Sequence, residues 1–529
     1  MPETFRTWQT ADVRSALIEG REIALLDLRE EDVHAQSHPL FAANFPLARI
    51  ELDAWSKLPR RDVPIVLLDD GEGEAETAAA RLQALGYTDV GLLAGGLRGW
   101  AEGGGELFRD VNAPSKAFGE LVEAVRHTPS LSAEEVHALI ESGADIRIVD
   151  ARRYDEYRTM SIPTATSVPG AELALRVPEL APNPDTLVIV NCAGRTRSII
   201  GTQSLRNAGL PNRVAALRNG TIGWTLAGFE LDHGQTRRFG EVSESTRRAA
   251  AESARALAGR AGVLHAQPDA LQVWSAQDDR TTYFFDVRTA EEYEAGHLPG
   301  FRHVAGGQLV QETEMVAPVR GARIVLADND GVRANMTASW LAQMNWEVWV
   351  IDGVPESDFV ERGPWQPSLP PLPEFPEISH EELAARAGAI DTLVLDFATS
   401  AEYLRGHIPG AAFALRSRLP DALAAAPDVR HFVLTSPDGR LARLAAQDLA
   451  ALRQDARIDV LADGTAAWRA AGRELESGPT RLLSPPLDRY RRPYEGTDNA
   501  RDAMQGYLDW EFGLVAQLER DGTHGFRVL

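Results

Sequence analysis

Residues 187–198 read LVIVNCAGRTRS, an apolar run followed by a short polar loop that begins at Cys192. A short apolar run bounded by turn-forming residues is typical of a buried strand. The following residues, 198–208, have the amphipathic spacing of a helix. The stretch therefore predicts a strand, a tight loop and a helix, with Cys192 at the carboxyl end of the strand.

The same pattern occurs three more times along the chain. The other stretches are PIVLLDDGEGE from residue 64, RIVLADNDGVRA from residue 323 and HFVLTSPDGRLA from residue 431. Upstream of each loop lies another apolar run that ends in Asp, at Asp27, Asp150, Asp286 and Asp396. The interval from this Asp to the first loop residue is 42 residues in three cases and 40 in the fourth. This constant spacing indicates four copies of one unit.

Strands that alternate with helices are typical of βαβ units, which form a parallel sheet with helices on both faces. We therefore predict an α/β fold with four repeats, at 1–112, 128–235, 263–366 and 376–478. The segment 236–262 is rich in Ala and Arg and predicts a linking helix. The segment 363–377 is rich in Pro and predicts a stiff extended linker. The tail, 479–529, is expected to pack on the last domain or to form an oligomer interface.

Three further features recur in the repeats. An Arg follows the first strand Asp by two residues in three repeats, at Arg29, Arg152 and Arg288, and Ala398 stands there in the fourth. The segments GHLPG at 296–300 and GHIPG at 406–410 are nearly identical, and Ser161 replaces the His in the second repeat. A Gly-x-x-x-Trp turn closes the second repeat at Gly220 to Trp224. We interpret the Asp150–Arg152 pair as structural and Trp224 as a core residue.

Together these motifs resemble the rhodanese family, and the resemblance covers nearly the whole chain apart from the linkers and the tail. More narrowly, the chain is similar to the four-domain tandem rhodaneses of bacteria. The resemblance implies that each repeat is a doubly wound parallel sheet flanked by helices. It also implies sulfur transfer through a cysteine persulfide, without a cofactor or metal.

Only the second repeat has the residue that this chemistry requires. Cys192 matches the nucleophile of the family, whereas the equivalent positions hold Asp69, Asp328 and Ser436. These three side chains cannot form a persulfide. We therefore expect the second repeat to be active and the other three to have structural, interfacial or regulatory roles.

The loop itself suits an anionic sulfur. Helix N-termini and curled loops present backbone N–H groups that stabilise a thiolate. Gly194 allows a tight turn, and Arg195 and Arg197 add positive charge that could anchor an anionic donor. We expect the thiolate to be the resting form of the cysteine. The predicted site consists of the nucleophile Cys192 and the binding residues Ala193, Gly194, Arg195, Thr196, Arg197 and Ser198.

We expect transfer from thiosulfate or a related donor to cyanide or a thiol. One alternative is a non-catalytic sulfur carrier or scaffold, because three repeats lack the cysteine. Another is a phosphatase or arsenate reductase, whose loop resembles Cys, five residues and then Arg. Here the Arg falls one residue early, at Arg197, so the loop is one residue short for a tetrahedral oxyanion.

Composition limits the other classes of protein. The 529 residues carry a formal net charge of −23, which argues against nucleic acid and against anionic membranes as partners. With one cysteine the chain cannot form an intrachain disulfide, and a cysteine metal cluster is not expected. We see no secretory signal and no membrane-spanning apolar run, so the expected location is cytoplasmic. A homo-oligomer is compatible with this composition.

Overall fold

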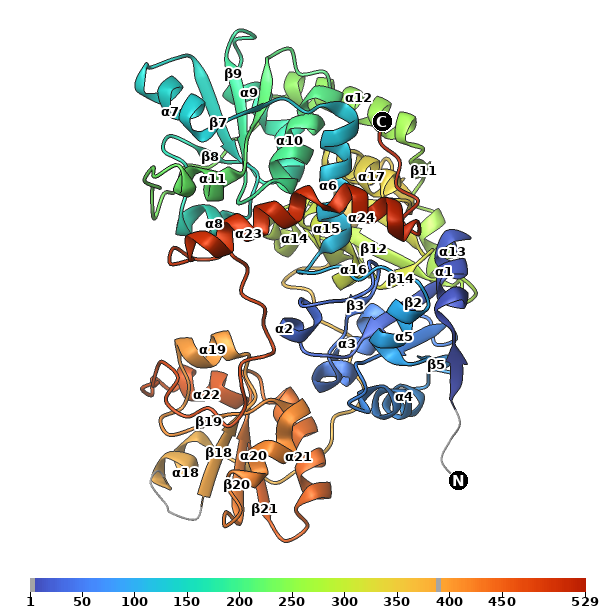
Figure 1. Ribbon diagram of the computed structural model, residues 1–529, viewed down its shortest axis with the longest axis vertical. Helices are drawn as coiled ribbons and strands as arrows, with labels where there is room; N and C mark the ends of the chain where they lie inside the picture. The colour runs from blue at the N-terminus through green and yellow to red at the C-terminus, as the bar shows by residue number, and fades with distance from the viewer. Residues whose placement is uncertain (1–4, 387–391) are drawn as a thin grey trace.

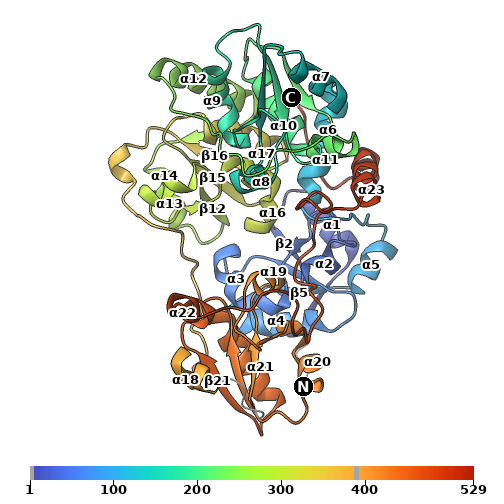
Figure 2. The same cartoon turned by 90° about the vertical axis from the view of Figure 1, so that its left-hand side faces the viewer.

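The computed structural model describes residues 5–386 and 392–529. The described residues form four α/β domains in chain order, each built around its own parallel sheet. Figures 1 and 2 show the second and third domains together at one end of an elongated molecule, the first domain beside them and the fourth at the opposite end. The predicted fold class, four doubly wound domains, is confirmed.

The second domain contains the Cys192 loop, and its sheet has the order β6-β10-β9-β7-β8 with every pairing parallel. Its strands are β6 (Ser130–Leu131), β7 (Ile146–Asp150), β8 (Thr166–Ser167), β9 (Leu187–Asn191) and β10 (Val214–Leu217). Its helices are α7 (Ala133–Glu141), α8 (Tyr154–Thr159), α9 (Leu173–Leu180), α10 (Thr196–Asn207) and α11 (Gly220–Leu226).

Helices on both faces of this sheet explain why the central strand is continuously apolar. Successive side chains of a strand point to opposite faces. Val188 and Val190 of β9 pack in one cluster with Leu173 and Leu205 of the helices α9 and α10. Ile189 points the other way and packs in a second cluster with Trp224 of α11. Both faces of β9 are therefore core, and its polar end is left at the edge where the loop begins.

The other three domains repeat this plan. The first has β1 (Arg6–Trp8), β2 (Ile23–Asp27), β3 (Ala43–Asn44), β4 (Ile65–Leu68), β5 (Val90–Leu93), α1 (Thr10–Ile18), α2 (Glu31–His34), α3 (Ile50–Lys57), α4 (Glu74–Ala84) and α5 (Gly96–Glu102). The third has β11 (Leu264–Ala266), β12 (Thr282–Asp286), β13 (Arg302–His303), β14 (Val319–Arg320), β15 (Arg323–Ala327), β16 (Glu347–Ile351), α13 (Ala270–Ser275), α14 (Ala290–Ala295), α15 (Gly306–Gln311), α16 (Thr313–Val316) and α17 (Arg333–Gln343). The fourth has β17 (Glu377–Ile378), β18 (Thr392–Asp396), β19 (Ala412–Phe413), β20 (His431–Thr435), β21 (Arg457–Leu461), α18 (His380–Ala385), α19 (Ser400–Arg405), α20 (Leu419–Ala424), α21 (Arg440–Leu452) and α22 (Gly464–Ala470).

Segments outside the repeats join the domains. The helix α6 (Ala113–Arg126) connects the first two domains and is buried along most of its length. The linking helix expected within 236–262 is α12 (Glu244–Ala261), which packs on α17 of the third domain and α9 of the second. Strand β14 of the third domain pairs antiparallel with β2 of the first domain. The first three domains therefore share one continuous framework.

The tail packs on the last domain, which is one of the two arrangements that we expected, and it also extends to the second domain. Its first part packs on the fourth domain, where Leu483 N donates to Phe413 O at 2.9 Å. It then crosses to the second domain and forms α23 (Arg501–Phe512) and α24 (Leu514–Asp521). Figure 1 shows these two helices, in red, running past α8 and α11 and then across α6. The tail therefore connects the two ends of the molecule.

In the ranges that the structure describes, no helix combines the length and the apolar character needed to cross a membrane.

Candidate functional site

The Cys192 loop lies between the end of β9 and the start of α10 and is held by the Gly-x-x-x-Trp turn. Thr221 N donates to Cys192 O at 2.9 Å, and Ile222 N donates to Ala193 O at 3.0 Å. The turn approaches so closely that a Cβ on Gly220 would lie 2.3 Å from Cys192 O. Gly220 also has a φ of +54°, a conformation that glycine adopts most easily. The turn therefore fixes the backbone on which the cysteine is carried.

The loop directs hydrogen-bonding groups toward the side chain at its first position. The Cys192 thiol donates to Ser198 Oγ at 3.4 Å, six residues further along. In the first and third domains the residue six positions along also forms a hydrogen bond with the first loop side chain, here through its backbone N–H. Ala75 N donates to Asp69 Oδ2 at 3.0 Å, and Ala334 N donates to Asp328 Oδ2 at 2.7 Å. The loop is thus a cradle for an anion or another acceptor at the cysteine position.

In the domains without cysteine, the side chain at that position itself occupies the cradle. Asp69 and Asp328 each accept a second loop amide, from Gly71 and Gly331. In the fourth domain Ser436 Oγ accepts from Ala442 N at 3.3 Å. A carboxylate or hydroxyl there satisfies the amides and leaves no nucleophilic sulfur. At this loop position the second domain has a sulfur atom, whereas the other three domains have an oxygen-bearing side chain.

Arg195, which we expected to be available to an anionic donor, is engaged elsewhere. Its guanidinium donates to Glu120 Oε1 and Oε2 of α6 at 2.7 and 2.8 Å, and it also pairs with Glu123. The ring of Phe512 at the end of α23 stacks 4.3 Å from the Arg195 carbon Cζ. With its donors directed at the two carboxylates and at Asn219 Oδ1, and with Phe512 against its face, Arg195 anchors the loop to α6 and to the tail.

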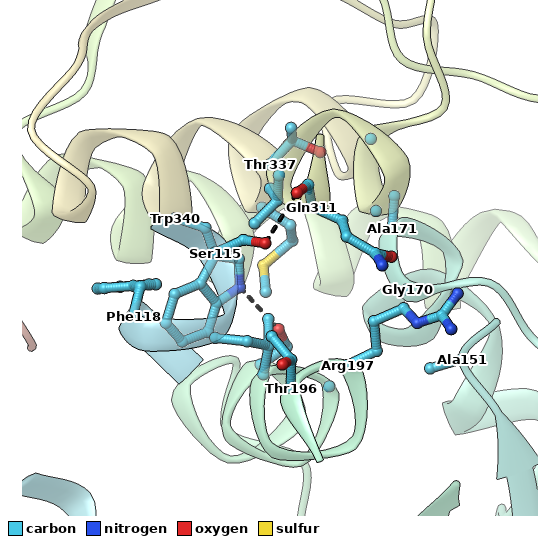
Figure 3. Close-up of a pocket in the computed structure, with 17 residues that line it drawn as sticks. Ser115, Phe118, Ala151, Gly170, Ala171, Thr196, Arg197, Gln311, Thr337 and Trp340 are labelled. Atoms are coloured by element: carbon cyan, nitrogen blue, oxygen red, sulfur yellow. Dashed lines mark hydrogen bonds between the residues drawn. The ribbon is translucent and has the colours of Figure 1, made fainter. Parts of the chain in front are cut away.

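Arg197 is the loop arginine whose charge acts on Cys192. It donates to both carboxylate oxygens of Glu156 in α8, at 2.7 and 2.9 Å. Burial raises the pKa of Cys192, and the positive charge of Arg197 opposes this rise. Figure 3 shows Thr196 and Arg197 on the wall of a cavity of about 50 Å³ between the second and third domains. Of the two loop arginines, Arg197 is the one whose charge acts on the sulfur.

The remaining loop residues contact the tail or the neighbouring helix. A Cβ on Gly194 would lie 3.1 Å from Tyr507 Cε1 and 3.4 Å from Glu511 Oε2, both on α23. Ala193 packs in one apolar cluster with Tyr494, Tyr507 and other tail residues. On the opposite side, a Cβ on Gly119 of α6 would lie 2.8 Å from Thr196 Cγ2. The tail and α6 therefore enclose the loop.

This enclosure corrects our expectation that the thiolate is the resting form. Cys192 is only 1% exposed, and burial raises the pKa of its thiol. The Arg197 charge and the hydrogen bonds of Ser198 lower it, but burial has the larger effect. The physical reason is the desolvation of a charged sulfur beneath α23, which no local pattern around the cysteine reveals.

The pair Asp150–Arg152 is buried at the end of β7. Arg152 donates to both carboxylate oxygens of Asp150, at 2.9 and 2.7 Å, and to Met160 O at 2.6 Å. The fourth domain has Ala398 in place of this arginine, and burial raises the pKa of its Asp396 to about 7. A buried carboxyl without this arginine, as at Asp396, therefore takes up a proton more readily, which supports the structural interpretation of the pair.

Sequence reasoning did not find several residues of the enclosure. Glu120 and Lys116 come from α6, and Tyr494, Tyr507 and Glu511 come from the tail. Burial raises the pKa of Glu511 to about 8, and its Oε1 accepts from Tyr507 Oη at 2.7 Å. The only signal in the sequence was the aromatic and acidic composition of the tail, which indicates packing but not its partner.

The comparison with family models agrees with this architecture. The model described as the rhodanese-like domain matches residues 10–103, 132–227, 269–354 and 379–471. These matches cover well over half of the sequence, and the chain belongs to the rhodanese-like domain family. The resemblance inferred from the motifs is therefore confirmed.

A particular relative is similar over the full length. The crystal structure of thiosulfate sulfurtransferase from Pseudomonas aeruginosa shares 63% sequence identity and a TM-score of 0.98, and the match covers 99% of both chains. A curated relative, an HTH-type transcriptional regulator of Mycobacterium tuberculosis, is 33% identical over 90 residues. That match spans 17% of this chain and only 39% of the regulator, so the likeness is confined to one segment.

Proposed function

We propose that this protein is a sulfurtransferase that moves a sulfane sulfur from thiosulfate or a related anionic donor to a thiol or cyanide, through a persulfide on Cys192. The observation that carries the proposal is the cradle around position 192. In the other domains it holds a carboxylate or a hydroxyl, and in the second domain it would hold a persulfide anion. The similarity to the Pseudomonas aeruginosa thiosulfate sulfurtransferase supports the same chemistry.

The proposed reaction has two displacements. The Cys192 thiolate attacks the outer sulfur of thiosulfate and forms an S–S bond, while the sulfur–sulfur bond of the donor breaks and sulfite leaves with its electron pair. An acceptor nucleophile then attacks the outer sulfur of the persulfide, and the Cys192 thiolate is regenerated. Such a covalent intermediate predicts ping-pong kinetics.

Because burial raises the pKa of Cys192, the first displacement requires that the thiol be deprotonated. The thiol must lose its proton before attack, because the thiolate is the nucleophile. Arg197 and the loop amides can stabilise that charge once water or the donor reaches the sulfur. We therefore infer that deprotonation accompanies access to the loop.

A thiosulfate:cyanide assay with intact-mass measurement tests the proposal. We expect Cys192→Ala to abolish turnover and to lose the adduct of about 32 Da that one added sulfur gives. The matched control is Ser436→Ala, which changes the same loop position in the fourth domain and should retain both. If wild-type protein shows neither turnover nor adduct with thiosulfate, mercaptopyruvate or a persulfide donor, the enzyme proposal is overturned.

A second candidate function is a sulfur carrier, and the burial of Cys192 favours it. A cysteine that is 1% exposed can hold a sulfur without releasing it freely. A carrier predicts one adduct per chain but no multiple turnover with cyanide. Pre-steady-state and steady-state measurements on the same sample separate the two functions.

A further inference from the structure

A second cavity near the loop lies among the second domain, the third domain and the tail. It has a volume of about 240 Å³. The second domain contributes Arg152 and Arg197, and the third domain contributes Gln308 and Gln311. The tail residues 489–496 form the remaining wall. The tail lies outside all four matched family segments, so a single repeat could not form this cavity by itself.

The cavity is rich in arginine within a strongly acidic protein. Most of these arginines are already neutralised by carboxylates. The pairs are Arg152 with Asp150, Arg153 with Asp155, Arg197 with Glu156, and Arg489 with Glu495. These pairs leave little unneutralised charge for a ligand.

Arg492 is held less closely. Its ion-pair contact is with Glu495, at 3.6 Å, which exceeds hydrogen-bonding distance, and the charges of Glu31, Glu312 and Asp110 also act on it. Among the residues that the structure describes, its guanidinium forms no hydrogen bond with any of these carboxylates. The side chain is nevertheless 23% exposed, so most of it is withdrawn from solvent. A half-buried guanidinium with unused donors, facing a cavity, matches a small oxyanion, which accepts several N–H groups at once.

The cavity adjoins the nucleophile through two residues. Arg197 lines the cavity, and its charge acts on Cys192. Tyr494 also lines the cavity, and it belongs to the apolar cluster of loop and tail residues that includes Ala193. Arg197 and Tyr494 therefore connect the lining of the cavity with the surroundings of Cys192.

We propose that this cavity is the binding site for the anionic sulfur donor, and that Arg492 of the tail, with Arg197, determines the preference for a small oxyanion such as thiosulfate. This inference rests on the proposed sulfurtransferase function. It gives the tail and the cysteine-free third domain a definite role, since both supply walls of the site. Arg492 acts here as a residue that positions the donor.

Two measurements test this role, and one of them does not require turnover. The first is the KM for thiosulfate with cyanide as acceptor. The second is the ratio of Cys192 alkylation rates with anionic iodoacetate and neutral iodoacetamide, which is a clean readout because Cys192 is the only cysteine. The variants are Arg492→Gln, Arg492→Lys as the conservative change, and Arg520→Gln as the control. Arg520 is a tail arginine on α24 whose exposed side chain pairs with Glu106.

We expect Arg492→Gln to raise the KM for thiosulfate and to lower the iodoacetate-to-iodoacetamide ratio, each by about tenfold, the effect of losing one charge-assisted hydrogen bond. The iodoacetamide rate should not change, because the loop stays covered. Arg492→Lys should recover part of both effects, and Arg520→Gln should resemble wild type.

An unchanged KM and ratio in Arg492→Gln would overturn the donor-site proposal. If wild type forms no persulfide but its alkylation ratio depends on Arg492, the proposed function fails while the anion site stands. A fall in the iodoacetamide rate as large as that in the iodoacetate rate would show a general change at the loop, and would also overturn the assignment.

Discussion

At the residue scale, Glu511 is an ionisable group that lies buried over the Cys192 loop. Burial raises its pKa from 4.5 to about 8. Between these values the folded state holds a proton that the unfolded state has released. Stability from this group is therefore fully present below the lower value and is lost as the pH rises toward the higher one.

Replacing this carboxyl tests that linkage. We expect Glu511→Gln to melt close to wild type at about pH 5 and at a higher temperature than wild type at about pH 9, because the amide cannot ionise. Thermal unfolding followed by circular dichroism at both pH values measures the difference. The reverse pattern, with wild type more stable in alkali, would show that Glu511 is ionised and stabilising in the folded protein.

The buried pair at the end of β7 gives a second prediction at this scale. Arg152→Met leaves Asp150 without its partner, and breaking a buried ion pair in this way costs about 3–5 kcal/mol. The fourth domain, where Asp396 lacks an arginine and has a pKa of about 7, indicates that Asp150 would then take up a proton. The loss of stability should therefore be smaller at about pH 5 than at about pH 8.

Urea unfolding of Arg152→Met at the two pH values measures this effect. The control is Arg153→Met, whose side chain is 55% exposed and pairs with Asp155 at the surface. A surface pair contributes about 0–1 kcal/mol. Equal costs for the two substitutions would contradict a structural role for the buried pair.

At the element scale, α23 covers the loop at Gly194. We expect Gly194→Ala to push Tyr507, and with it α23, away from the loop by a few tenths of an ångström, because the new Cβ would lie only 3.1 Å from Tyr507 Cε1. The displacement should expose Cys192 and accelerate its alkylation by iodoacetamide several-fold. Alkylation that is quenched at successive times and followed by intact-mass measurement gives the rate.

Gly506 on the same helix provides the control. No atom lies within 4 Å of a Cβ at Gly506, so Gly506→Ala introduces no steric conflict. Alanine favours the helix by about 1 kcal/mol over glycine, so this change should keep α23 in place and leave the rate the same or slower. A rate in Gly194→Ala equal to that of Gly506→Ala would mean that α23 does not limit access to the cysteine.

At the scale of the whole molecule, the fourth domain docks on the first through Arg416. This buried side chain donates to both carboxylate oxygens of Glu51, at 2.7 and 2.9 Å, and to Ala48 O at 3.1 Å. The Pro-rich linker 363–377 is expected to act as a stiff spacer between the third and fourth domains. The interface and the tail also hold the fourth domain in place.

Removing the Arg416 contacts should loosen this domain without touching the cysteine. We expect Arg416→Ala to speed limited proteolysis within 363–377, while alkylation and turnover at Cys192 stay at wild-type values. Arg453→Ala, which changes an arginine in the same domain that pairs with Asp455, is the control. Unchanged proteolysis would show that this interface contributes little to the arrangement of the domains.

The sequence by itself determined the repeat, the α/β class and the position of Cys192 at the end of a strand. These features depend on contiguous residues: the strand 187–191, the loop from Cys192 and the helix that follows are neighbours in the chain. The interval of 42 residues between Asp150 and Cys192 also survives in other repeats, so internal comparison could reveal it. Local patterns are enough wherever the determining contacts are local.

Only the tertiary structure decided the environment of Cys192. Gly194 meets Tyr507 across more than 300 residues of sequence, and Arg195 is neutralised by Glu120 of a helix that lies outside the repeats. No periodicity links such segments, so the burial of Cys192 and the position of Arg492 at the cavity could not be predicted. The charge state of a thiol depends on what excludes water from it, and in this protein that is the folded tail.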